Sequence, residues 1–275
     1  MRNATLYIAE PLTEGVTTFF AAERVLAAGA TAQDNHQIIE LRGFGRGLVL
    51  NGRLHRCDLD REIHREALAH PALVAHPHPK RVLLLGAGGG DVLREILRHR
   101  SVERVVVVEP QSALVEHARA HLADWSDGAF DDPRTRLIKS DVRGFLADAR
   151  EADFDVIIAD LPGPLDGGAA ARCYTREAFA AAKALLAPGG LFAIAAGSAA
   201  LTRPEQLVDC RATLQDVFKT VRLATVLLTS TLEPRAVALA SDDVDPAAVP
   251  VGIVVERRAE RDVAAVAQHA ANQPS

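Results

Sequence analysis

The sequence predicts an α/β fold with two parts: a small N-terminal β region and a mainly parallel sheet covered by helices on both faces. Short strand-like segments separated by turn residues occupy the first part, up to residue 57. From Lys80 onward, apolar strand-like runs alternate with amphipathic helical segments, which is typical of a parallel sheet. The most apolar of these runs, Val82–Leu85, leads directly into a glycine cluster and then a helical segment.

Composition limits the classes of function. The chain has 275 residues, 48% of them hydrophobic, so a sizeable core is expected. Its formal net charge is −5 and no basic stripe is visible, which argues against nucleic-acid binding. No apolar run has the length of a membrane span, and no signal peptide is visible. Three scattered cysteines without a C-x-x-C pair favour a reduced, cytoplasmic protein.

The first region, residues 1–57, is predicted to be a set of short strands. Segments 37–41 and 47–50 have strand character, and Asn51-Gly52 is a hairpin signal that makes 53–57 the return strand. The alanine-rich segment 19–32 is expected to be helical or loose. A connecting region, residues 58–79, follows, with a helix over 60–75 that ends at His76-Pro77-His78-Pro79.

Residues 80–245 are predicted to form the Rossmann-like domain, and residues 246–275 a tail whose end is disordered. Pro188-Gly189-Gly190 is expected to be the turn between a helix and the next strand, and the last two strands are expected to pair antiparallel at the sheet edge. The expected strands are 82–85, 105–108, 136–138, 155–159, 191–195, 221–228 and 235–240, and the expected helices are 91–99, 111–122, 142–149, 175–186 and 204–217.

The glycine cluster and the strand after it predict a nucleoside site. Gly86, Gly88 and Gly90 stand between a strand and a helix, where backbone N–H groups approach a nucleotide closely. A lone G-x-G pattern is weak evidence, since glycine also serves ordinary tight turns. The next strand, however, ends in Glu109, about 20 residues after the glycines, where such folds bind ribose hydroxyls.

The order of motifs over roughly residues 33–245 resembles the spermidine synthases, the polyamine aminopropyltransferases. Ordinary methyltransferases share only the later part of this order. The resemblance implies an N-terminal β domain joined to a methyltransferase-type Rossmann-like domain, often in dimers, so a homodimer is expected. The matching segments are His36-Gln37-Ile38-Ile39-Glu40, Gly47–Gly52, Asp60–Glu66, Ala69-His70-Pro71, the glycine loop, Leu93-Arg94-Glu95, Val108-Glu109, Ser140-Asp141, Phe154–Ile157, Asp160 and Leu186–Gly190.

The resemblance also implies roles for individual residues. Gln37 would lie near the sulfonium nucleoside, Glu109 would bind both ribose hydroxyls, and Asp141 with Val142 would hold the adenine amino group. The alternatives are that Gln37 is a surface strand residue and that Asp141 is only the N-cap of the following helix. Asp160 would orient the attacking amine and help to deprotonate it.

Chemistry gives Asp160 a task. The residue follows the buried run Val156–Ala159, so it lies at the carboxyl end of a strand, where open α/β sheets bind their ligands. Attack on a sulfonium carbon needs a neutral amine, and free alkyl amines are mostly protonated at neutral pH. A carboxylate that accepts the proton and fixes the approach would help. The alternative is a loop carboxylate that caps a turn before Pro162.

The chain departs from the family pattern around the side chains of donor and acceptor. Glycine stands at position 89, where the family has the aspartate that holds the donor's amine, and Gly163 replaces an acidic residue that holds the diamine. His64 and Arg65 replace a Tyr–His or Tyr–Gln pair, and Arg65 is expected to pair with the carboxylate of an intact S-adenosylmethionine donor.

Two further residues are candidates for substrate binding. Asp91 either reaches back to the donor's amine or only caps its helix. Tyr174 follows a glycine- and alanine-rich loop, 167–171, that either closes over the acceptor as a lid or is an ordinary surface loop with Tyr174 packed behind it.

Three functional hypotheses follow. The first is aminopropyl transfer from decarboxylated S-adenosylmethionine to an amine other than putrescine, because the residues for a diamine are missing. The second is methyl or 3-amino-3-carboxypropyl transfer from intact S-adenosylmethionine. The third is a non-catalytic nucleoside-binding protein, which the presence of both Asp141 and Asp160 argues against. No metal site is expected, since the histidine spacing fits no common zinc pattern.

Overall fold

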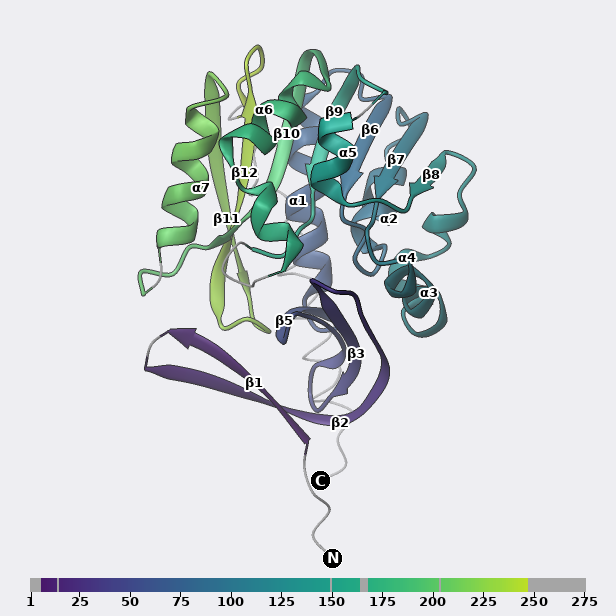
Figure 1. Cartoon of the computed structure of the whole chain (residues 1–275), viewed down its shortest axis with the longest axis vertical. Helices are drawn as coiled ribbons and strands as arrows, with labels where there is room; N and C mark the ends of the chain where they lie inside the picture. Colours follow the sequence, from purple (N-terminus) through teal and green to yellow (C-terminus); the bar gives the residue numbers. More distant parts are fainter. Residues whose placement is uncertain (1–5, 14, 149, 164–167, 203, 247–275) are drawn as a thin grey trace, which may run out of the picture.

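The computed structural model describes residues 6–13, 15–148, 150–163, 168–202 and 204–246. Two sheets make up the molecule: a five-stranded N-terminal sheet, and a seven-stranded sheet flanked by helices (Figure 1). The predicted fold class is thereby confirmed. The division of the chain at residues 57, 79 and 245 stays a prediction, and the expected tail from 247 onward lies outside the described residues.

The N-terminal sheet is an antiparallel meander in sequence order. The Asn51-Gly52 hairpin is present, with positive φ angles of 51° and 80° at its two residues, as a type I′ turn requires. The strands are β1 (Leu6–Thr13), β2 (Val16–Ala30), β3 (Asn35–Leu41), β4 (Gly45–Leu50) and β5 (Arg53–Cys57).

The expectation for segment 19–32 was wrong. Most of it belongs to β2, a 15-residue strand that pairs with β1 on one side and β3 on the other. Alanine is a weak strand former, but pairing on both edges outweighs its local preference. Two register shifts against β3 show that the long strand bends.

Helix α1 (Arg61–Ala75) connects the two sheets. Its buried side includes His64, Leu68 and Ala72. Asp60, directly before the helix, accepts hydrogen bonds from the backbone N–H and the hydroxyl of Ser230 at 2.7 and 2.8 Å. These bonds fix the start of the helix against the loop that follows β11.

The large sheet has the order β11-β12-β10-β9-β6-β7-β8. Its five strands from β10 to β8 are parallel, whereas β12 pairs antiparallel with both β10 and β11, as expected for the last two strands. The strands are β6 (Arg81–Leu85), β7 (Arg104–Val108), β8 (Thr135–Ile138), β9 (Phe154–Ala159), β10 (Leu186–Ser198), β11 (Thr220–Leu228) and β12 (Glu233–Ser241).

Helices cover both faces of this sheet. The segment 188–190, expected to be a turn, lies within β10 at an irregularity in its pairing with β9, so that strand begins earlier than predicted. The helices are α2 (Asp91–Leu97), α3 (Ser112–His121), α4 (Ala123–Ser126), α5 (Val142–Asp148), α6 (Arg176–Ala184) and α7 (Glu205–Gln215), with short 3₁₀ turns at Ala129–Asp131 and Ala169–Cys173.

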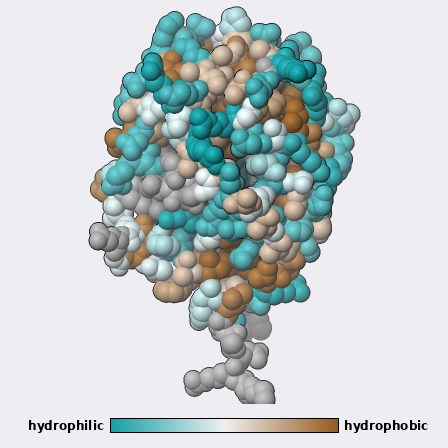
Figure 2. Space-filling model, in the orientation of Figure 1, coloured by the Kyte–Doolittle hydropathy of each residue, from teal (hydrophilic) through white to brown (hydrophobic). Residues whose placement is uncertain are grey.

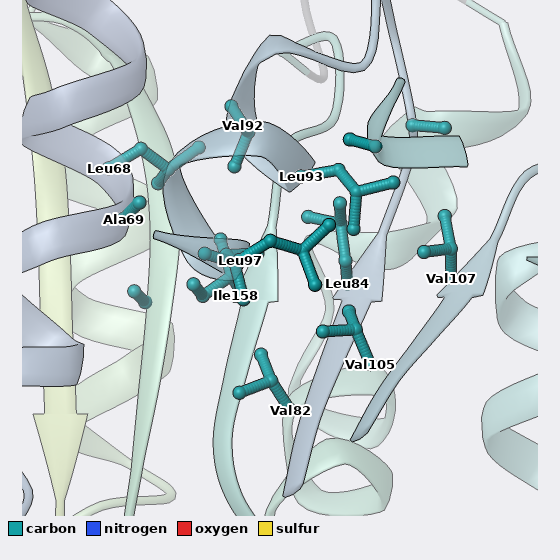
Figure 3. Packing of buried hydrophobic residues seen from close by; sticks show 14 of the residues in the cluster. Leu68, Ala69, Val82, Leu84, Val92, Leu93, Leu97, Val105, Val107 and Ile158 are labelled. Carbon is teal, nitrogen blue, oxygen red and sulfur yellow. The ribbon is translucent and has the colours of Figure 1, made fainter. Parts of the chain in front are cut away.

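The core lies on both faces of the sheet because successive side chains of a strand point to opposite sides. Val82 and Leu84 of β6 pack with Leu68 of α1 and Leu93 of α2, and Figure 3 shows this face from close by. Leu83 belongs to the second cluster, on the opposite face. Within the described ranges, no helix is long and apolar enough to cross a membrane.

Candidate active site

A cavity of about 530 Å³, including the space at its mouth, lies at the carboxyl ends of β6, β7 and β9. It brings together residues that are far apart in the sequence, which is where open α/β sheets place their ligands. Its lining includes Asp34, Gly86, Gly88, Glu109, Gln111, Asp141, Val142, Asp160, Leu161, Pro162 and Ala170.

The glycines of the loop are required by close contacts. Gly86 has a φ of +85°, and a Cβ atom there would lie 2.4 Å from the backbone oxygen of Asp160. Gly90 has a φ of +83°, and its Cβ would lie 2.6 Å from both Phe130 and Ser126. Only glycine allows this backbone to pass so close to its neighbours. Gly86 and Gly88 line the cavity, whereas Gly90 supports the loop from behind.

Glu109 is buried in the cavity wall. Its two carboxylate oxygens accept hydrogen bonds from the backbone N–H groups of Ala87 and Gln111, at 2.8 and 2.9 Å. Burial is the largest influence and raises the pKa of Glu109 to about 7, against the opposing effect of these backbone donors. Each oxygen keeps a lone pair that can accept a hydroxyl, so the group suits a pair of ribose hydroxyls.

Asp141 fits both of the alternatives raised by its sequence context. Its carboxylate accepts a hydrogen bond from the N–H of Gly144 at 2.9 Å, so it caps the start of α5. Its side chain is exposed and also lines the cavity, next to Val142. The adenine role of these two residues stays a prediction.

On β3, the cavity's neighbour is His36 rather than Gln37. Gln37 is half-buried, pairs with Ala28 and Val49 across the sheet, and is not among the residues that line the cavity. The His36 ring lies 2.8 Å from the side-chain oxygen of Gln111, which does line it.

Asp34 was missed by sequence reasoning. It lies between β2 and β3, bonds to Asn51, and accepts the backbone N–H of Ala169. The first 35 residues have no readable pattern, so nothing in the sequence marked Asp34.

An ionic cluster centred on Arg56 lies beneath the cavity. The guanidinium of Arg56 donates to Asp91 and to Asp160, each at 2.5 Å, and all three side chains are at most 1% exposed. Although burial opposes it, Arg56 holds the pKa of Asp160 well below its usual value. Asp160 is therefore a carboxylate with a fixed orientation and low basicity. Asp91 interacts with Arg56, and one of its oxygens finds no hydrogen-bond partner within the described ranges.

Two histidines complete the cluster. Because arginine only donates, the Nε2 atom of His55, 2.8 Å from Arg56, must be the unprotonated ring nitrogen. Burial lowers the pKa of His55, in keeping with a neutral ring. His64 donates from its Nε2 to the ionised Asp160 at 3.2 Å. Of the residues predicted to bind substrate, His64 and Asp91 are thus brought to Asp160.

Arg65 and Tyr174 are not brought to the cavity. Arg65 is buried in contact with Glu95 of α2, with 3.0 Å between its Nε and the carboxylate. The hydroxyl of Tyr174 donates to the backbone oxygens of Ala195 and Leu161, at 2.9 and 3.3 Å. Tyr174 therefore packs behind the loop that follows Asp160, which agrees with the alternative of an ordinary surface loop rather than a lid.

Trp125 fills the space beside Gly89. A Cβ atom at Gly89 would lie 2.5 Å from the indole ring, which is fully buried and donates from its Nε1 to Asp58 at 2.7 Å. An acidic side chain therefore has no room at position 89.

A second, small cavity lies next to the histidines that contact Asp160. Its polar lining consists of His55, His64, Gln206 and Arg235, and no carboxylate is among its lining residues. Separately, no cluster of three metal-binding side chains occurs in the described part of the chain.

Comparisons with known proteins agree with this architecture. The spermine/spermidine synthase domain family matches residues 61–241. A polyamine aminopropyltransferase 2 of Hyperthermus butylicus is 40% identical over 241 residues, 88% of this chain and 78% of the relative. A thermospermine synthase of Arabidopsis thaliana is 33% identical, covering 85% of this chain and 69% of its own.

Solved structures give the same result. A crystal structure of spermidine synthase in complex with the transition state analogue AdoDATO has a TM-score of 0.82 and 28% identity, and the match covers 90% of this chain and 83% of that one. The resemblance noted in the sequence is thus confirmed, and the chain belongs to the spermine/spermidine synthase family of transferases.

Proposed function

We propose that the protein transfers an aminopropyl group from decarboxylated S-adenosylmethionine to an amine other than putrescine, releasing methylthioadenosine. The observation that carries this proposal is the pairing of a buried carboxylate at the nucleoside end of the cavity, Glu109, with an oriented carboxylate on the next strand but one, Asp160. A sulfonium nucleoside between them would present its reactive carbon to an amine held at Asp160.

The proposed binding roles follow the lining of the cavity. The backbone of the loop from Gly86 to Gly88 lies against the donor, and Glu109 accepts its ribose hydroxyls. Asp141 accepts the adenine amino group, with Val142 packing against the base. Gln37 keeps its predicted place near the nucleoside only if the side chain turns toward the cavity, because His36 and Gln111 are nearer in the structure.

In the proposed reaction, the amine's lone pair attacks the carbon bonded to the sulfonium sulfur. A C–N bond forms, the C–S bond breaks, and its electron pair returns to sulfur as a neutral thioether. The nitrogen, which carries the positive charge after the attack, releases its proton to solvent water. Asp160 accepts a hydrogen bond from the amine and fixes its approach. Because Arg56 lowers the pKa of Asp160, we propose that Asp160 mainly orients the amine and is only a weak proton acceptor.

The second cavity supports an acceptor other than putrescine. A diamine brings two ammonium groups, and an unpaired buried charge is costly. The lining of that cavity offers histidines, an amide and an arginine instead of acidic partners.

Intact S-adenosylmethionine, in methyl or 3-amino-3-carboxypropyl transfer, is a second candidate donor. Trp125 leaves no room for an acidic group at position 89 that would repel the donor's carboxylate, and Arg56 lies close to Gly88.

A product assay separates these donors. Purified protein is incubated with each donor and a panel of amines, and methylthioadenosine and adenosylhomocysteine are measured by mass spectrometry. Asp160→Asn is expected to lower turnover by roughly 10²-fold or more while methylthioadenosine binds within a few-fold. Asp209→Asn, an exposed aspartate on α7, is the matched control and should behave as wild type. Adenosylhomocysteine as the only product, methylthioadenosine formed only with intact S-adenosylmethionine, or full activity in Asp160→Asn would refute the proposal.

We also propose that the protein is a homodimer and works in the reduced cytoplasm. All three cysteines are buried and free. The β1–β2 hairpin exposes Leu6, Tyr7, Val16 and Phe19, each about half exposed or more, and hydrophobic side chains gather over the lower part of the molecule in Figure 2. Such a patch is typical of an interaction surface. Light scattering should give twice the chain mass, and Phe19→Asp should give the monomer.

A further inference from the structure

We propose that the acceptor is an amine that also carries an anionic group, a carboxylate in the simplest case, held by Arg235 and Gln206 in the second cavity. This inference rests on the proposed transfer to an amine and names the chemical class of that amine.

Arg235 provides a cation that pairs with none of the carboxylates in the described part of the chain. It lies on β12, and since side chains alternate along a strand, it shares its face with Val237 and Leu239, which pack in the cluster that includes α1. Its side chain is half-buried and lines the cavity. A guanidinium placed in this way is suited to a planar carboxylate, which it binds through two parallel hydrogen bonds.

Gln206 provides a second, independent sign of a ligand. The residue is 8% exposed, and its Nε2 atom has no hydrogen-bond partner among the described residues. A buried N–H donor without a partner is costly, and native structures rarely retain one without a reason.

Two glycines make room for this amide. A Cβ atom at Gly163 would lie 2.2 Å from its Nε2 atom, and one at Gly197 would lie 2.3 Å from its Cδ atom. The amide of Gln206 is therefore packed closely against the backbone of both glycines, and it lines the same cavity as Arg235.

The other end of the cavity is suited to the amine. His55 and His64 line it and contact Asp160, the carboxylate that we propose orients the nucleophile. An acceptor with an amine at one end and a carboxylate at the other would place each group against a partner of fitting charge. A diamine would place its second ammonium against Arg235, where like charges repel.

A matched series of amines tests the inference. Putrescine, pentylamine and 5-aminopentanoate share one amino-alkyl arm and differ in the end group: ammonium, methyl or carboxylate. We expect kcat/KM for the carboxylate to exceed those for the other two by roughly tenfold or more, the scale of a charged hydrogen bond. Shorter and longer sets, with the same end groups, remove the effect of chain length. An aminoalkylphosphonate in each set tests whether the anion need be a carboxylate.

Variants assign the effect to the two side chains. Arg235→Gln should lower kcat/KM for 5-aminopentanoate by roughly 10- to 100-fold and that for pentylamine by less than about threefold. Gln206→Leu should act in the same direction with a smaller loss. Arg235→Glu should reverse the preference toward putrescine. Arg222→Gln, an exposed arginine on the adjacent strand that pairs with Asp245, is the matched control and should change nothing.

The outcomes separate this inference from the proposed transfer. Methylthioadenosine release with any amine supports the transfer proposal. If kcat/KM for putrescine equals or exceeds that for 5-aminopentanoate, and Arg235→Glu does not change this order, the anionic acceptor is overturned while the transfer proposal stands. If no amine supports release, the transfer proposal fails. Calorimetry of the same amines with methylthioadenosine-saturated protein then still decides the inference: tighter binding of the carboxylate, lost in Arg235→Gln, supports it, and any other order overturns it.

Discussion

Replacing Arg56 by methionine would test the ionic cluster beneath the cavity. Methionine keeps much of the volume of the apolar part of the Arg56 side chain but removes its charge. Two buried carboxylates, Asp91 and Asp160, then lack their cation. Breaking a buried ion pair in this way costs about 3–5 kcal/mol. Unfolding entropy of about 2.1 cal/mol/K per residue gives roughly 0.6 kcal/mol/K for this chain, so Tm should fall by about 5–9 °C.

The loss of unfolding free energy in Arg56→Met should depend on pH, whereas a loss caused by a simple packing defect would not. In the wild type, the depressed pKa of Asp160 means that its contribution to stability is present above its unfolded value, about 3.9, and is lost as pH falls through the lower folded value. Without Arg56, burial dominates and raises that pKa. The deficit in unfolding free energy should then be largest near pH 8 and shrink toward pH 5, where protonation removes the unpaired charge.

Urea unfolding at both pH values, followed by fluorescence of the single tryptophan, measures this deficit. Arg98→Met is the control, because Arg98 is 61% exposed and the buried carboxylate of Glu95 that it contacts keeps Arg65 and His70 as partners. It should cost less than about 1 kcal/mol. A deficit for Arg56→Met below about 1 kcal/mol, or one that is the same at pH 5 and pH 8, would refute the account of Arg56 as the charge that holds Asp160.

Three further predictions concern neighbouring groups. Because the pKa of Glu109 is about 7, methylthioadenosine should bind more weakly as pH falls below 7, and titration calorimetry should find this slope absent in Glu109→Gln. Gly89→Asp should lower unfolding free energy by about 1–3 kcal/mol through its clash with Trp125, and Trp125→Leu in the same chain should recover part of it; an unchanged Tm would mean that the ring moves aside freely. Asp60→Ala should lower the unfolding free energy by about 1–3 kcal/mol, because it leaves the Ser230 donors unpaired, whereas Asp209→Ala at an exposed position should have little effect. Equal losses in the two variants would mean that the Asp60–Ser230 hydrogen bonds do not stabilise the fold.

The sequence predicted the large sheet well because its strands are buried on both faces. Runs such as Val82–Leu85 and Val105–Val108 are continuous apolar segments bounded by turn residues, and they have no other plausible place than a sheet interior. Strand β2 could not be found in this way. Its side chains are mostly exposed or half-buried, and its pairing partners, not its own residues, make it a strand.

Around the site, the sequence was enough to predict the residues that follow strands of the large sheet. It was not enough to predict the residues that lie between the two sheets. Glu109 and Asp160 each follow a predicted strand, so the topology alone brings them together. Arg56 lies 35 and 104 positions from its two partners, on a five-residue strand without an apolar pattern. No local signal relates such residues, so the sequence pointed to Arg65 instead, which the fold places against Glu95.

The bond from Arg56 to the two aspartates has a consequence for how the chain can be divided. Arg56 comes from the small sheet, and both carboxylates come from the large one. A fragment consisting of the large sheet alone would lose the cation that orients Asp91 and Asp160, and the small sheet alone would lose both partners of its guanidinium. The ion pairs therefore couple the stability of the two parts. The two are expected to unfold in one cooperative step, and grafting this β region onto a relative without the matching acids would fail.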